Sequence, residues 1–140
     1  LHADEPHVEI YDIYQQTLIN LSQGHDEQKI LRIFEKKLLQ ELGYGLALDH
    51  EASTGELLNE QNNYFYVADM GPCLERPKNN ESVKISGKAL TALRLEQGWN
   101  TEIAMEAKML LRMVLKSHVG DKPFGSRELY RAYLQNVNNT

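Results

Sequence analysis

Two long segments in which apolar residues recur every three or four positions constrain the fold most strongly. This spacing places apolar side chains along one face of an α-helix. Asp26 and Gly43 have the residue types of an N-cap and a C-cap for the first segment, and Asn100 or Thr101 and Gly120 have them for the second. We therefore predict a mainly α-helical bundle. The periodic residues are Ile30, Leu31, Phe34, Leu38 and Leu42 in the first segment and Ile103, Ala107, Leu110 and Val114 in the second.

The rest of the chain divides into further predicted helices and a middle segment without helical periodicity. Tyr64 to Val67 is rich in strand-forming residues, which favours a small β-insertion or an ordered loop at this point. We expect one domain over residues 1–140, helical at 8–43 and 86–135, with short strands or loop at 44–80. The predicted helices are 8–21, 27–42, 87–95, 101–119 and 127–135.

Composition is that of an ordinary globular domain. The chain has 140 residues, of which 41% are hydrophobic and 25% charged. Its apolar runs are too short to span a membrane. Because Cys73 is the one cysteine, an internal disulfide and a four-cysteine zinc site are excluded. The chain begins at Leu1 without a charged-then-apolar leader, so we expect no signal peptide and a missing N-terminal part.

The motifs that resemble catalytic or metal-binding patterns are incomplete. Residues 86–88 read Ser-Gly-Lys, but a phosphate-binding loop needs a glycine where Ser82 stands and a serine or threonine where Ala89 stands. Two carboxylate–histidine clusters, at 25–27 and 49–51, lack the second histidine at helical spacing that a zinc pair requires. We therefore predict no catalytic residue, no metal site and no cofactor.

Charge is distributed unevenly along the chain. Residues 1–107 carry nine basic and 18 acidic side chains, a net charge of −9, whereas residues 108–140 carry six basic and two acidic ones, a net charge of +4. The basic end suits phosphate or carboxylate binding. The alternative is that cations near helix C-termini only stabilise the helix dipole. The basic residues are Lys108, Arg112 and Lys116, which share one helical stripe, followed by Lys122, Arg127 and Arg131.

Two further stripes allow either a binding or a structural interpretation. In the helix at 27–42, the cations Arg32, Lys36 and Lys37 lie beside the apolar seam. Such a seam could accept an acidic peptide that ends in an aromatic residue, but an ordinary amphipathic helix has the same pattern. The second stripe is formed by Met105, Met109 and Met113, and we interpret it as core filler.

Several blocks together resemble the RecO family of DNA repair proteins. The first block is Phe34-Glu35, Leu38-Leu39 and Leu42-Gly43-Tyr44-Gly45. The second is Ala107-Lys108, Arg112-Met113, Leu115-Lys116, Gly120-Asp121-Lys122-Pro123 and Ser126-Arg127-Glu128-Leu129, with Ser86-Gly87 and residues 90–93 between the two. The resemblance covers residues 25–135.

The resemblance implies a fold and a function. RecO proteins have an N-terminal OB-fold, which this chain lacks, followed by a mostly helical C-terminal domain, to which it corresponds. The family is non-enzymatic and binds single- and double-stranded DNA. It anneals complementary strands, partners with RecR, recognises the acidic tail of single-stranded-DNA-binding protein, and so helps to load RecA. The implied location is the bacterial cytoplasm, associated with the nucleoid.

The resemblance also implies roles for individual residues. The middle segment offers His50, Ser53 and Cys73 but no cysteine pair, which places the chain in the zinc-free branch and makes the packing of Tyr64 and Tyr66 essential there. A domain that binds only protein, without DNA contact, remains the alternative. The implied tail-binding residues are Arg32, Phe34, Lys36 and Lys108, and the implied DNA-binding residues are Arg112, Lys116, Lys122, Arg127 and Arg131.

Overall fold

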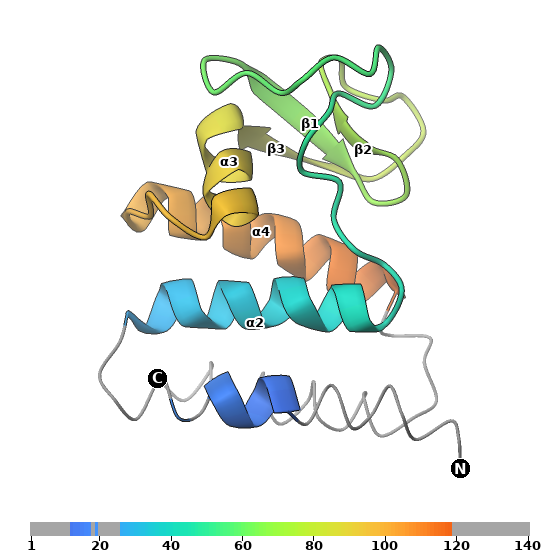
Figure 1. The fold of residues 1–140 in the computed structure, drawn as a ribbon. Coiled ribbons are helices and arrows are strands. Elements are labelled where there is room, and N and C mark those ends of the chain that lie inside the picture. The colour runs from blue at the N-terminus through green and yellow to red at the C-terminus, as the bar shows by residue number, and fades with distance from the viewer. Residues whose placement is uncertain (1–11, 18, 20–25, 119–140) are drawn as a thin grey trace.

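A small sheet, a short helix and two long helices are stacked in layers in the computed structural model, which describes residues 12–17, 19 and 26–118 (Figure 1). Helix α4 lies between the sheet and α2, and the helical residues 12–17 lie against the far side of α2. The elements are α2 (Glu27–Glu41), β1 (Asn63–Val67), β2 (Gly71–Cys73), β3 (Ser82–Ser86), α3 (Gly87–Leu95) and α4 (Thr101–His118).

The helix boundaries follow the capping residues of the sequence. The Asp26 carboxylate accepts hydrogen bonds from the backbone N–H groups of Gln28 and Lys29, at 3.0 and 3.3 Å, and so begins α2. Gly43 follows the helix with φ +91°, in the left-handed region that favours glycine. The side chain of Asn100 accepts from the N–H of Ile103 at 2.8 Å, so Asn100 caps α4.

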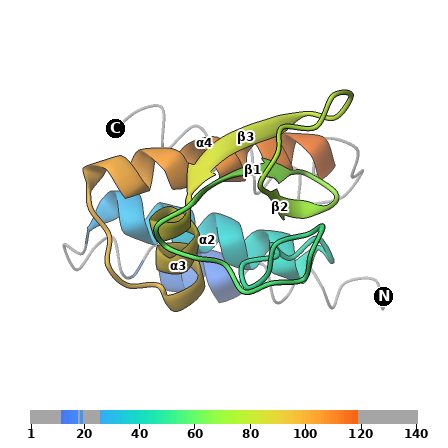
Figure 2. The same ribbon diagram turned by 90° about the horizontal axis from the view of Figure 1, so that it is seen from above.

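The predicted β-insertion is an antiparallel sheet in the order β2-β1-β3 (Figure 2). Tyr64 and Tyr66 on β1 are each 2% exposed and point into the core, as the prediction of their packing requires. Their hydroxyl oxygens accept hydrogen bonds from the N–H groups of Asn59 and Ala47, both at 2.8 Å. The two tyrosines therefore hold the loop before the sheet as well as the sheet itself.

Strand β3 (Ser82–Ser86) lies, except for its last residue, between the predicted insertion at 44–80 and the predicted helical segment at 86–135, where the sequence analysis placed no element. It pairs along its whole length with β1, from Asn63 opposite Ser86 to Val67 opposite Ser82. Ile85 is fully buried and Lys84 is exposed, so the strand has the alternating pattern of a sheet with one covered face. Only five residues separate the predicted insertion from the predicted helix, which is why the strand was missed.

Helix α3 follows β3 without a loop. Ser86 is its N-cap and accepts from the N–H of Ala89 at 3.1 Å. Glu106 on α4 accepts from the N–H and the hydroxyl of the same serine, at 2.7 and 3.0 Å. This carboxylate therefore fixes the β3–α3 junction against α4, as expected for a helix N-terminus rather than a phosphate loop.

One core joins the two long helices, α3 and the inner face of the sheet. The predicted seams are largely buried: on α4 all four periodic residues are at most 8% exposed, and on α2 Leu31, Phe34 and Leu38 are at most 3% exposed. The helix predicted at 8–21 is observed at residues 12–17 and 19. The rest of that prediction, the helix at 127–135 and the end of the long helix after His118 lie outside the described residues.

Candidate functional site

Arg32 lies inside the protein rather than at the rim of α2. Its side chain is 0% exposed, its Nε is 2.6 Å from Oε1 of Glu35, and its Nη1 donates to Oε1 of Gln28 at 3.2 Å. Glu35 is equally buried. In this arrangement a carboxylate of a bound peptide would have to reach Arg32 past Gln28 and compete with Glu35. This burial could not be predicted, because a spacing of four residues places Arg32 and Lys36 on one stripe of the helix without showing whether a position is at the rim or buried.

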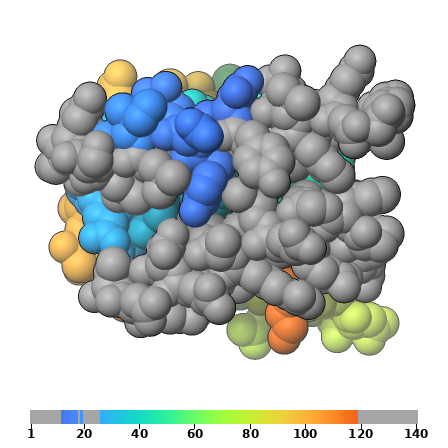
Figure 3. Space-filling model, turned by 90° about the horizontal axis from the view of Figure 1, so that it is seen from below, coloured from blue at the N-terminus to red at the C-terminus, as the bar shows by residue number. Residues whose placement is uncertain are grey.

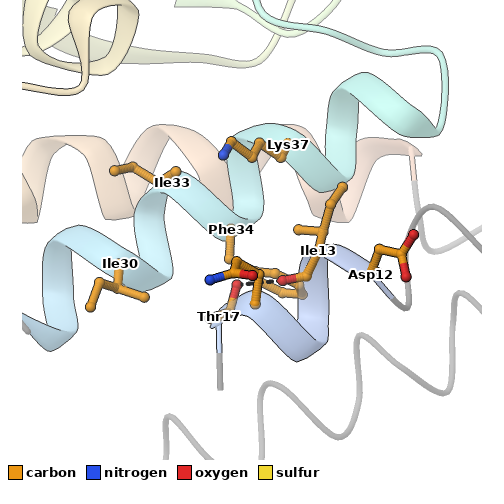
Figure 4. Close-up of a pocket in the computed structure, with 8 residues that line it drawn as sticks. Asp12, Ile13, Thr17, Ile30, Ile33, Phe34 and Lys37 are labelled. Atoms are coloured by element: carbon orange, nitrogen blue, oxygen red, sulfur yellow. Dashed lines mark hydrogen bonds between the residues drawn. The ribbon is translucent and has the colours of Figure 1, made fainter. Parts of the chain in front are cut away.

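Phe34 lies on the opposite side of α2, towards the helical residues 12–17. Its ring is 6.0 Å from the ring of Tyr14 at an interplanar angle of 59°. It contributes to a pocket of about 350 Å³ between the two helices (Figure 4). The helical residues 12–17 are visible in blue on the underside of the molecule (Figure 3). Half of the lining residues are apolar and half are polar or charged, with Asp12 and Lys37 at different points along the wall. The lining residues are Asp12, Ile13, Gln16, Thr17, Ile30, Ile33, Phe34 and Lys37.

Lys36 is occupied by a structural role. Its Nζ donates to the carbonyl oxygen of Leu93 and lies next to Oε2 of Glu96, each at 2.8 Å. Leu93 lies in the last turn of α3, and Glu96 is the C-cap, with a left-handed φ of 59°. The lysine therefore neutralises a helix C-terminus and ties α2 to α3.

The predicted basic stripe of α4 is formed and faces outward. Lys116 is exposed, and Lys108 and Arg112 are half-buried. Within the described part of the chain, none of the three forms an ion pair with a carboxylate at salt-bridge distance. Nε of Arg112 is buried and has no hydrogen-bond partner there. The stripe thus offers cationic groups to a partner.

The methionine stripe on α4 is a correction to the sequence analysis. Met113 is 8% exposed and belongs to the core, but Met105 and Met109 are each 62% exposed. Met105 and Met109 are each three residues before a cation, Lys108 and Arg112, and residues three apart lie on the same side of a helix, so these two methionines share the outward face with the basic stripe. We call the residues Met105, Lys108, Met109, Arg112 and Lys116 the α4 face.

Arg32 pairs with the buried carboxylate of Glu35, and Lys108 lies near enough to this pair and to Arg112 to be affected by their charges. Burial lowers the pKa of Lys108, the positive charges of Arg112 and Arg32 lower it further, and only the charge of Glu35 raises it. Lys108 therefore has two cations and one carboxylate as its charged neighbours, which leaves an excess of positive charge between α2 and α4.

A second pocket, of about 420 Å³, opens beside this cluster, between the N-terminal ends of α2 and α4. Lys108 and Met105 line it, and so does Gln28, which accepts the hydrogen bond from Arg32. The four predicted tail-binding residues therefore do not form one site. Arg32 and Lys108 converge here, Phe34 lines the pocket under α2, and Lys36 is bound to α3.

Three of the predicted DNA-binding residues, Lys122, Arg127 and Arg131, lie outside the described residues. The two that the structure places, Arg112 and Lys116, are one helical turn apart on the α4 face.

Among residues 12–17, 19 and 26–118, no group of side chains forms a catalytic or metal-binding site. No group of three or more histidine, cysteine, aspartate or glutamate side chains in that part could hold a metal ion. Cys73 is 7% exposed, and burial followed by the negative charge of Glu51 raises the pKa of its thiol, which disfavours the nucleophilic thiolate. No helix in the same part is long and apolar enough to cross a membrane.

Residues 1–128 match the family described as "Recombination protein O C terminal". The proteins named "DNA repair protein RecO" of Nitrosospira multiformis and Methylococcus capsulatus are 33% and 35% identical to this chain, over 96% and 94% of its length. That of Coxiella burnetii is 39% identical over 92% of the chain. These matches cover 56%, 53% and 55% of the relatives, so the chain spans about half of their length.

Proposed function

The chain belongs to the RecO family, as its C-terminal domain, and from this membership we propose that it is a non-enzymatic binding module of recombinational DNA repair. The observation that carries the proposal is the α4 face, where three cationic side chains and two exposed methionines point outward without carboxylate partners among the described residues. Such a face binds anionic partners and performs no chemistry on them.

One partner of this module is the acidic tail of single-stranded-DNA-binding protein. Lys108 and Arg112 supply the cations for its carboxylates. The terminal aromatic side chain enters the neighbouring pocket of about 420 Å³, against Ala104 and Met105. Arg32, held by Glu35 and Gln28, supports this site electrostatically from inside.

The second partner is single-stranded DNA. Arg112 and Lys116 contact backbone phosphates, and Lys122, Arg127 and Arg131, which lie outside the described residues, are assigned to DNA by the family resemblance alone. At the level of the whole protein, these contacts would assist strand annealing, association with RecR and the loading of RecA, in the cytoplasm at the nucleoid. Affinity that comes from phosphate neutralisation falls with rising salt.

The DNA assignment is tested by fluorescence anisotropy with a labelled oligothymidylate at several salt concentrations. The variant Arg112→Gln/Lys116→Gln should bind more weakly and lose about one unit of salt slope for each phosphate contact removed. Lys37→Gln, an exposed lysine on α2, is the matched control. If the double variant keeps the affinity and the salt slope of the unaltered chain, these two residues do not contact DNA.

The tail assignment is tested by calorimetry with an acidic peptide ending in a free aromatic residue. Lys108→Gln should weaken binding about tenfold or more, since it removes a charge-assisted hydrogen bond. Lys108 suits this test better than Arg32, because Arg32→Ala would leave Glu35 buried and uncompensated and would destabilise the fold. Unchanged affinity of Lys108→Gln would remove Lys108 from the peptide site.

A protein-only scaffold is the second candidate, and the exposed methionines favour it, because flexible thioether side chains suit protein surfaces. The net charge of −9 in residues 1–107 also opposes DNA. Under this alternative the chain binds the acidic peptide and fails to bind the oligothymidylate even at low salt.

A further inference from the structure

The outer face of the sheet carries an arginine–aromatic cation–π pair that plays no part in the proposed function. Tyr64 and Tyr66 on β1 point into the core, so Phe65 between them points to the opposite face. The guanidinium carbon of Arg76 lies over the Phe65 ring, 5.4 Å from its centroid. Phe65 is half-buried and Arg76 is exposed.

The strand register brings a second cation to the same face. Lys84 on β3 is directly opposite Phe65, and directly opposed residues share a face of the sheet. Lys84 is exposed, and no carboxylate in the described part of the chain lies within ion-pair distance of it or of Arg76. The face therefore presents a guanidinium group over an aromatic ring, a pair that we call the stack, flanked by a lysine.

A pocket of about 560 Å³ adjoins the stack and shares Arg76 with it. Cys73, the partner of Phe65 on β2, lies in its wall. Met70 and Leu74, which are 54% and 48% exposed, add apolar surface at its edge. A flat, largely apolar group could therefore lie against Arg76 and extend over this pocket.

We propose that this outer face of the sheet, built from Phe65, Arg76 and Lys84, is a stacking platform for an unpaired base of single-stranded nucleic acid. The base stacks on the guanidinium group of Arg76, which Phe65 holds from the sheet by a cation–π contact, and Lys84 contacts a neighbouring phosphate. A duplex does not fit, because its bases are already stacked on each other. This inference rests on the proposed DNA binding and adds a second contact surface to it.

The charge of this face makes stacking, rather than phosphate neutralisation, the main contribution. Between residues 74 and 84 the cations Arg76, Lys78 and Lys84 are offset by Glu75 and Glu81, which leaves one net positive charge. The α4 face supplies the larger electrostatic attraction. The two surfaces are connected at one point, since Nε2 of His118 at the end of α4 is 3.4 Å from Oδ1 of Asp69 in the β1–β2 turn.

The test compares two variants of the stack with a matched control in the same anisotropy titration. Phe65→Leu keeps apolar contact without an aromatic ring, and Arg76→Lys keeps the charge without the planar guanidinium. Each should weaken oligothymidylate binding about fivefold or more, the size of one lost base stack, with an unchanged salt slope. Lys37→Ala, on α2 at the opposite end of the molecule from the sheet (Figure 1), should bind as the unaltered chain does.

An oligonucleotide of abasic sugar-phosphates separates stacking from charge. The unaltered chain should bind it about fivefold or more weakly than oligothymidylate, and both stack variants should bind it as the unaltered chain does. Full oligothymidylate affinity in Arg76→Lys, which alters an exposed side chain and leaves the core intact, would overturn the stacking platform while leaving the α4 assignment in place. If the unaltered chain binds neither oligonucleotide, the proposed DNA binding itself is wrong.

Discussion

Gly87 is the position at which one added methyl group should disturb the fold most clearly. A Cβ built on Gly87 would lie 2.1 Å from the carbonyl oxygen of Asn59, 2.8 Å from Cα of Glu60 and 2.9 Å from the carbonyl carbon of Asn59. All three neighbours are backbone atoms, so no side chain can rotate away. The variant Gly87→Ala must therefore displace either α3 or the loop before β1.

The cost of this displacement can be worked out from the contacts that it strains. Overpacking by one methyl group costs about 1–3 kcal/mol. The shift also weakens the hydrogen bond from the N–H of Gly87 to the carbonyl oxygen of Asn62, now 2.8 Å, which adds about 1 kcal/mol. Alanine raises the free energy of unfolding by up to about 1 kcal/mol, because it has a higher helix propensity than glycine and restricts the unfolded chain. The net loss of unfolding free energy is about 2 kcal/mol.

Equilibrium urea unfolding of the 140-residue chain, followed by circular dichroism, measures this loss. Gly45→Ala is the matched control, because its Cβ would meet nothing closer than 3.8 Å and its φ is not left-handed. Gly45→Ala should leave stability unchanged or raise it slightly. If Gly87→Ala unfolds at the same urea concentration as the unaltered chain, the close approach of α3 to the Asn59 carbonyl is wrong.

Three further predictions concern buried polar groups. Burial alone would raise the pKa of Glu51, but hydrogen bonds from the N–H groups of Ser53 and Thr54 outweigh it and lower the pKa below 4.5. Stability from this group is present above pH 4.5 and lost as pH falls through the lowered pKa, so Glu51→Gln should flatten the acid limb of a pH–stability curve. The pKa of Lys108 is lowered from 10.5 in the folded chain. Between the lowered pKa and 10.5 the unfolded chain binds more protons than the folded chain, so stability rises with pH in this range. Thermal melts of Lys108→Met should lack this rise. Tyr66→Phe leaves a backbone N–H without its acceptor and should lower the unfolding free energy by about 1–3 kcal/mol in urea.

The helices were predictable because local rules decide them. The side chains of Asp26, Ser86 and Asn100 accept hydrogen bonds from backbone N–H groups two or three residues later. A helix start of this kind can therefore be predicted from a few neighbouring residues. The core seam of α4 is equally local, since its period alone places four residues on one face. The roles of Tyr64 and Tyr66 were predictable only through the family resemblance and the missing cysteines.

The burial of Arg32 was not predictable, because it depends on residues far along the chain. On α2, Arg32 and Lys36 occupy similar positions in the helical repeat, yet one pairs with Glu35 inside the protein and the other binds the end of α3. Likewise, Met109 and Met113 are one turn apart on α4, and only the second reaches the core. Periodicity gives the face of a helix, but the packing of other elements decides which part of that face is covered.

The cluster around Glu35 links stability and binding in opposite senses. Burial first, and then the charges of Arg112 and Arg32, lower the pKa of Lys108, so the protonated lysine destabilises the isolated fold. The proposed anionic partner would reverse this balance by supplying negative charge. Its binding would therefore stabilise the native state by mass action and favour protonated Lys108 at the same time. Replacing Lys108 with an uncharged residue would relieve the repulsion and would also weaken the binding of the partner. A gain in stability coupled to a loss of affinity is the signature of a cation placed for binding rather than for folding.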